Sequence, residues 1–421
     1  MKTNYKVEGF SKTTILNSFL YILIFICIIW NSGYALSKTS WNIARPLLYV
    51  TVVACLIATV IKNNGKIQMK CNLANMWYWW FVISFIISAV FNINKDNLKS
   101  ALFMIILITT ARAISRIITF ETFVKVFITT MKLLTIISIV SFLIVNRIGP
   151  NWLPKILNYN GVTYYNGILF FFQYNDIGII SRCMSIFWEP GVYASFLIIA
   201  LIFESCFKNE KESKLNIIIF ITGIIFSSSS AGYLLLLLYI ALRMSMNKGA
   251  KYIIAMVISV VAAILIFIFA NSLQNLLLQL NYDLFYKFFY SNNITSGTRI
   301  YSPLINFNIF LESPLFGVGF STADTLYSML MESYKSVYYV VAQTSTSTIF
   351  LASSGVLGLV YSFSLFFPVL KIKRLNLITR LIISAILLLI VNKEPHTSML
   401  VTYCIMFYFI YYNLNEKKEY L

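Results

Sequence analysis

Long apolar runs, separated by short polar segments, repeat along most of the chain. About twelve of them are long enough to cross a ~30 Å hydrocarbon core as helices. A bilayer offers no hydrogen bonds to an exposed backbone, so such runs are expected to cross it as α-helices. The predicted spans are 13–31, 42–61, 76–92, 99–118, 122–146, 191–207, 215–228, 232–244, 252–270, 341–367, 379–392 and 398–413. The pattern predicts an all-α polytopic membrane protein whose residues 1–421 form a single integral membrane domain.

Two of the predicted outer loops are long, spanning residues 147–190 and 271–340. In the second loop, leucines from Leu273 to Leu284 recur on one helical face, which is typical of a short helix lying on the membrane surface. Ser302-Pro303 then predicts a helix start, and Ser313-Pro314 followed by two glycines predicts its end. Both loops are therefore expected to carry short interfacial helices.

Composition supports a membrane location and explains the charge. The chain is 59% hydrophobic and 11% charged, with a net charge of +18. Most of its 33 lysines and arginines fall in alternate loops, which places those loops and both termini in the cytoplasm. The basic residues are dispersed, so the charge does not indicate a nucleic-acid partner. A signal-peptide reading of the N-terminus remains open, but the first apolar run is long for one, which favours an uncleaved helix.

Cysteine and histidine usage gives no metal signature. The six cysteines form no CxxC motif and His396 is the only histidine. A Cys/His zinc site is therefore not expected. We predict no metal and no cofactor, and we interpret the cysteines as small packing residues.

The segment "RCMSIFWEPGVYASF" places Arg182 and Glu189 just before an apolar helix. One interpretation is an ion pair that tethers the loop to that helix. The other is a site in which Arg182 binds an anionic ligand and Glu189 acts as a base or as a hydrogen-bond partner of the substrate. Pro190 and Gly191 would begin the helix there, and helix N-termini favour anions.

A similar order of residues recurs in the second loop, where Arg299 precedes Glu312, Ser313-Pro314 and Gly317. Arg299 is either a contact to a phospholipid headgroup or a second guanidinium for the same phosphate. The shared order suggests that the two loops face one site.

The third polar cluster is "NKEPHTSML", a short outer loop containing Lys393, Glu394 and His396. It is either an ordinary polar hairpin or part of the site, with His396 as a candidate general base.

With these residues placed, the chain resembles the Wzy-type O-antigen and capsular polysaccharide polymerases of the O-antigen ligase/polymerase superfamily. The resemblance rests on "RCMSIFWEPGVYASF", "SSSSAGYLLLLL", and "GTRIYSP" with "FLESPLFGVGF" and "STSTIFLASSGVLGLVYSF". Two departures stand out. Ligase-like members carry a His-Asn pair where this chain reads "VAQTSTSTIF", and many relatives have an arginine in the hairpin that here reads "SSSSAG".

The resemblance implies a metal-independent glycosyltransferase in the bacterial inner membrane. Its substrate would be an oligosaccharide unit on undecaprenyl pyrophosphate, presented at the outer leaflet among membrane lipids, with a chain-length regulator as a further partner. Arg182 and Arg299 would stabilise the departing pyrophosphate, and Glu189 would deprotonate the acceptor, with His396 or Glu394 behind it. Lys393, Glu394 and Glu312 would complete the substrate-binding set.

Two other functions remain open. A flippase for lipid-linked oligosaccharides would also be basic with about twelve spans, although the second long loop has no counterpart in the first half of the chain. An O-antigen ligase is the alternative within the enzyme class.

Overall fold

The computed structural model describes residues 22, 24–40, 44–62, 73–158, 162–173, 182–246, 292–333 and 343–419. Side chains are described within 22, 24–40, 46–55, 75–158, 162–173, 182–246, 301–331 and 343–412. The predicted span 252–270 and the predicted surface helix at 273–284 lie outside these residues.

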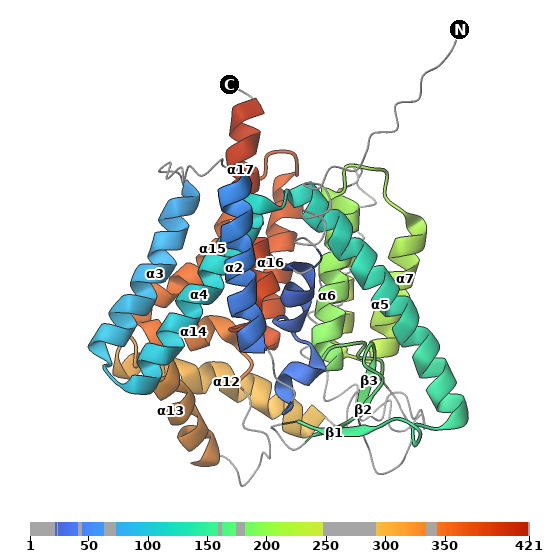
Figure 1. Cartoon of the computed structure of the whole chain (residues 1–421), viewed down its shortest axis with the longest axis horizontal. Helices are drawn as coiled ribbons and strands as arrows, with labels where there is room; N and C mark the ends of the chain where they lie inside the picture. Colours follow the sequence, from blue (N-terminus) through green and yellow to red (C-terminus); the bar gives the residue numbers. More distant parts are fainter. Residues whose placement is uncertain are drawn as a thin grey trace.

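Most of the described chain is helical, and the helices form one bundle (Figure 1). After a helical segment at 24–30, the elements are η1 (Ala35–Lys38), α2 (Ala44–Lys62), α3 (Leu73–Phe91), α4 (Lys95–Ile117), α5 (Phe120–Ile148), α6 (Pro190–Ile202), the π-helical turn η2 (Phe203–Phe207), α7 (Lys214–Ser227), α8 (Ser230–Ser245), α12 (Asn292–Glu312), α13 (Phe320–Ser333), α14 (Thr346–Ser354), η3 (Gly355–Gly358), α15 (Leu359–Leu370), α16 (Leu377–Lys393) and α17 (Leu400–Glu419).

Four helical segments of the described chain are long and apolar enough to cross a membrane: Lys95–Ile117, Phe120–Ile148, Pro190–Phe207 and Thr346–Leu370. Five shorter apolar helices accompany them. Exposed leucines, isoleucines and valines occur along the outer helices; Ile83, Ile136 and Leu143 are examples. Such a surface is typical of helices that face lipid. These features describe a helical membrane-embedded protein.

Helix α6 lies inside the bundle, and other helices pack around it. All thirteen residues from Pro190 to Ile202 are buried, and α5, α7 and α8 pack around it. A helix that is apolar on every face is expected to be buried in this way. Any side chain at its N-terminus is therefore held by a rigid element.

The first long loop is partly a β-sheet, so the all-α prediction is wrong in this segment. Strands β1 (Lys155–Leu157), β2 (Thr163–Asn166) and β3 (Phe171–Gln173) form an antiparallel sheet in the order β1-β2-β3. In the register, Ile156 lies opposite Tyr164 and Tyr165 opposite Phe172. Alternating aromatic residues suit a pleated, half-buried surface better than a helix. The sheet lies at the lower edge of Figure 1 together with α12 and α13, and α17 ends at the opposite edge.

The predicted helix start at Ser302-Pro303 is also wrong. Helix α12 begins at Asn292 and continues through Pro303. The Ser302 hydroxyl does not cap a helix but accepts a hydrogen bond from the Thr344 backbone N–H at 3.0 Å. The predicted end is confirmed, because α12 stops at Glu312 just before Ser313-Pro314.

The turn after α12 is packed into a break between α14 and α15. The Val318 and Gly319 N–H groups donate to the carbonyls of Ala352 and Ser353, both at 3.0 Å, and Gly317 has φ +70°. A β-carbon on Gly317 would lie 2.3 Å from the Ser353 carbonyl carbon. Only glycine fits this close approach.

Replacing Gly317 with alanine is therefore expected to destabilise the fold through both backbone strain and a steric clash. Gly149 is a matched control, because its φ is +82° but nothing lies within 4 Å of a β-carbon there. Gly317→Ala should cost about 1–3 kcal/mol more than Gly149→Ala, measured by thermal unfolding in detergent. Equal shifts for the two variants would contradict the packed turn.

Two of the basic residues that were predicted on the cytoplasmic side, Arg116 and Arg374, lie at the end of the bundle opposite the sheet. The Arg116 Nε donates to the Tyr411 hydroxyl at 2.8 Å, and Arg374 donates to the Cys206 carbonyl at 2.6 Å. Arg374 also lies 5.0 Å from the centre of the Tyr412 ring. The two guanidinium groups at this end contact a backbone carbonyl and tyrosine side chains. The candidate site lies at the other end of the bundle.

Candidate functional site

The N-terminal end of α6, residues Trp188–Gly191, is the centre of the candidate site, and we refer to it as the α6 mouth. Glu189 is the N-cap residue in an extended conformation, and Pro190 takes the first helical position, as the sequence predicted. The Glu189 side chain makes no capping hydrogen bond and is partly exposed. The helix start therefore fixes the backbone of Glu189, and its carboxylate does not cap the helix.

The polar loop between α16 and α17 packs against the same helix end. Lys393 Nζ donates to the Gly191 carbonyl at 3.3 Å and lies 3.7 Å from Glu394 Oε1. The side chains of Lys393 and Glu394 are only 10% and 1% exposed. A β-carbon on Gly191 would approach Glu394 Oε1 to 2.4 Å, so this carboxylate occupies the N-terminal turn of α6.

This placement changes two predictions. The anion favoured at the N-terminus of α6 is Glu394 from the protein itself. Glu394 and Lys393 hold two helices together at the site, and in this arrangement neither offers an open surface to a substrate. The alternative interpretation of the segment, a polar hairpin between helices, describes them better.

His396 is completely buried in the same loop. Its Nδ1 lies 2.8 Å from the Thr402 hydroxyl, and its backbone N–H donates to the Thr346 hydroxyl at 2.8 Å. Burial, helped by the positive charge of Lys393, lowers the pKa of His396 to about 3. A neutral ring with no exposed surface cannot receive a proton from a substrate in this conformation, so the structure gives His396 a packing role instead of the predicted role as a base.

The buried His396 ring predicts a loss of stability in acid. The unfolded chain has a histidine pKa near 6.5, so it binds a proton at a higher pH than the folded protein. The contribution of the neutral ring to the free energy of unfolding is fully present above pH ~6.5. It falls as the pH drops toward 3, by about 2 kcal/mol at pH 5. Thermal unfolding of wild type and His396→Gln between pH 7 and 5 measures this, and the variant should lose that part of the slope. Identical slopes would contradict the buried neutral ring.

The sheet of the first loop reaches the α6 mouth through Tyr164. Its hydroxyl donates to the Trp188 carbonyl at 2.9 Å and accepts from Asn158 at 3.0 Å. Burial raises the pKa of Tyr164, and the nearby negative charge of Glu189 raises it further. Strand β2 is thus joined through Tyr164 to the residue that precedes Glu189.

Arg182 lies in the same stretch but contacts a different element. The segment between Arg182 and Glu189 is not helical, and Ser185 has φ 52°. The guanidinium of Arg182 donates to the Ser228 carbonyl at 2.9 Å, in the hairpin between α7 and α8. The backbone N–H of Cys183 donates to Phe226 in the same hairpin at 2.9 Å.

The structure describes the side chain of one of the two residues predicted in the second loop. Arg299 belongs to α12, but its side chain lies outside the described part of the chain. Glu312 is exposed at the C-terminal end of α12. The middle of α12 contacts the start of α14 through Asn306 and Thr348 at 3.2 Å, which leaves Glu312 about 9 Å further along the helix. Among the described residues, no hydrogen bond or ion pair joins Glu312 to the α6 mouth.

Lys38 was missed as a site residue, because in the sequence it is one cation in a short outer loop. It ends η1, and its Nζ lies 4.6 Å from the centre of the Trp188 ring. Trp188 directly precedes Glu189, so a cation from the N-terminal region reaches the α6 mouth. Only the pairing of distant segments reveals this contact.

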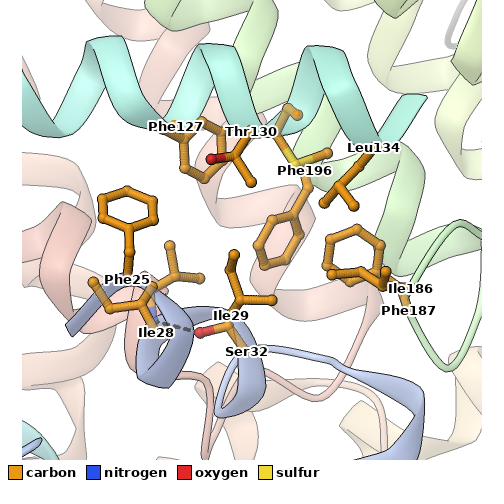
Figure 2. Close-up of a pocket in the computed structure, with 12 residues that line it drawn as sticks. Phe25, Ile28, Ile29, Ser32, Phe127, Thr130, Leu134, Ile186, Phe187 and Phe196 are labelled. Atoms are coloured by element: carbon orange, nitrogen blue, oxygen red, sulfur yellow. Dashed lines mark hydrogen bonds between the residues drawn. The ribbon is translucent and has the colours of Figure 1, made fainter. Parts of the chain in front are cut away.

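An apolar pocket adjoins the mouth on the inner side. Figure 2 shows Phe25, Ile28 and Ile29 of the N-terminal helix facing residues of α5 and α6. Ile186 and Phe187, just before the mouth, complete the lining, which contains no ionisable side chain. The pocket suits apolar groups and offers no acid or base.

The described residues contain no group of three or more His, Cys, Asp or Glu side chains placed to hold a metal ion. The chemistry available at the site is that of a carboxylate, guanidinium and amine cations, and aromatic or amide surfaces. Comparison of the chain with protein-family models and with curated proteins finds no match.

Proposed function

We propose that the protein polymerises lipid-linked oligosaccharide repeat units by metal-independent glycosyl transfer at the outer face of a bacterial plasma membrane. The observation that carries this proposal is the α6 mouth. There a partly exposed Glu189 lies at the start of a buried helix, beside Tyr164 of strand β2. A base held at a fixed position by a rigid element is a feature that such a transfer needs.

The reaction assigns a task to each side chain. The acceptor hydroxyl oxygen of the new unit bonds to the anomeric carbon of the growing chain as the bond from that carbon to the pyrophosphate oxygen breaks. Glu189 takes the hydroxyl proton, and the bonding electron pair leaves with the pyrophosphate. A cation fixed near the leaving group stabilises its developing charge.

Arg182 is the candidate for that cation. Many of the polymerases that the chain resembles carry an arginine in the hairpin between the equivalent helices, where this chain has serines. Here Arg182, which precedes α6, donates a hydrogen bond from its guanidinium to the Ser228 carbonyl of that hairpin. This supports a role for Arg182 in the place of the missing arginine, and Arg299 remains a second candidate.

A surface-polysaccharide gel from a strain lacking the gene tests the proposal. A band for a single repeat unit in place of the ladder, with the ladder restored by the wild-type gene, is the expected result. Loss of the single-unit band as well would indicate a flippase. Accumulation of full-length polymer on its lipid carrier would indicate a ligase.

A further inference from the structure

The η1 turn is fixed against the α6 mouth by its backbone. The Ala35 N–H donates to the Ile186 carbonyl at 2.8 Å, and the Trp188 N–H donates to the Gly33 carbonyl at 3.0 Å. An isolated bridge joins Tyr34 to Phe187, and a second joins Thr39 to Asn158 of the first loop. Residues on both sides of Lys38 are therefore tied to the elements that form the site.

The amine of Lys38 is held over an aromatic ring without an anion. Its Nζ lies 4.6 Å from the centre of the Trp188 ring. Burial lowers the pKa of Lys38, with no carboxylate offsetting it. Among the described residues, none forms a hydrogen bond or ion pair with this amine. An ammonium group that is partly removed from water is stabilised by any oxyanion that reaches it.

We propose that Lys38, positioned by Trp188, is a binding residue for a phosphate group of the lipid-linked substrate. This inference rests on the proposed function and adds a cation to it that neither the sequence motifs nor the resemblance indicated. The indole ring limits where the amine can lie, and the next residue is Glu189. A phosphate bound by Lys38 therefore lies at the α6 mouth, to which Trp188 belongs.

Binding of farnesyl pyrophosphate and of farnesol to the purified protein in phosphatidylcholine nanodiscs tests this role. Lys38→Gln should bind farnesyl pyrophosphate ~10-fold or more weakly, as expected for loss of a charged hydrogen bond, with farnesol binding unchanged. Lys38→Arg should retain most of the affinity. Lys155→Gln is a matched control, because Lys155 Nζ lies 5.7 Å from the Tyr165 ring on the same sheet but is exposed.

The outcomes separate this inference from the proposed function. Unchanged binding of farnesyl pyrophosphate by Lys38→Gln, while wild type prefers it to farnesol, overturns the role of Lys38 and leaves the polymerase proposal intact. Equal binding of the two probes by wild type overturns the lipid pyrophosphate substrate, and the Lys38 role with it. Equal loss of both probes in Lys38→Gln indicates structural damage and overturns the binding role. Displacement of farnesyl pyrophosphate by phosphatidylglycerol in the nanodisc assigns Lys38 to phospholipid headgroups, which also overturns it.

Discussion

Glu189→Gln is expected to remove the polysaccharide ladder and leave the single-unit band. The substitution keeps the size of the side chain and its position at the N-cap of α6, but the amide cannot accept a proton. A positioned base contributes ~10²–10⁴-fold to a transfer of this kind. Because Glu189 makes no capping hydrogen bond, the start of α6 should be retained in the variant. The measurement is the gel ladder together with the amount and unfolding temperature of the purified variant.

Asp96→Asn is the control for this experiment. Asp96 lies in the first turn of α4 and pairs with Lys99 at 3.1 Å, with side chains that are 69% and 64% exposed. Removing this carboxylate should leave the ladder intact, since exposed pairs contribute little. A full ladder from Glu189→Gln at matched protein levels would refute the assignment of the base. Loss of the ladder from both variants would show that the effect is not specific to the α6 mouth.

The positions of the helices could be predicted from sequence because the bilayer sets a length for every apolar run. The predicted spans 122–146 and 191–207 correspond to α5 and to α6 with η2. Helix boundaries marked by proline and glycine, as at Pro190 and at Ser313-Pro314, were also predicted, because these residues constrain the backbone locally. Pro303 was misread, because a proline inside a long helix gives the same local signal as one at its start.

The candidate site was only partly predictable. Local sequence identified Glu189 and Arg182. It could not show that Lys393 and Glu394 would lie close to each other, buried against the start of α6. It could not show that His396 would be buried beside Thr346 either. Exposure and partners depend on contacts between segments far apart in the chain, and a single sequence does not encode these as a readable pattern. Lys38 was overlooked for the same reason.

Glu204→Ala is expected to cause the largest loss of stability among the substitutions considered. The carboxylate of Glu204 is 0% exposed near the end of the apolar α6–η2 segment. It accepts hydrogen bonds from Lys208 at 3.0 Å, from the Ser213 backbone N–H at 2.6 Å and from Asn216 at 2.9 Å. It thereby joins the end of α6 to the start of α7.

Removing the carboxylate of Glu204 leaves a largely buried ammonium group and two other donors without their acceptor, which typically costs ~3–5 kcal/mol. Unfolding followed by intrinsic fluorescence in detergent measures the change. Glu210→Ala is the matched control, because Glu210 pairs with Lys125 at 3.7 Å and both side chains are about 70% exposed. Its effect should stay within about 0.5 kcal/mol. If the two variants unfold alike, the carboxylate of Glu204 does not stabilise the connection between α6 and α7.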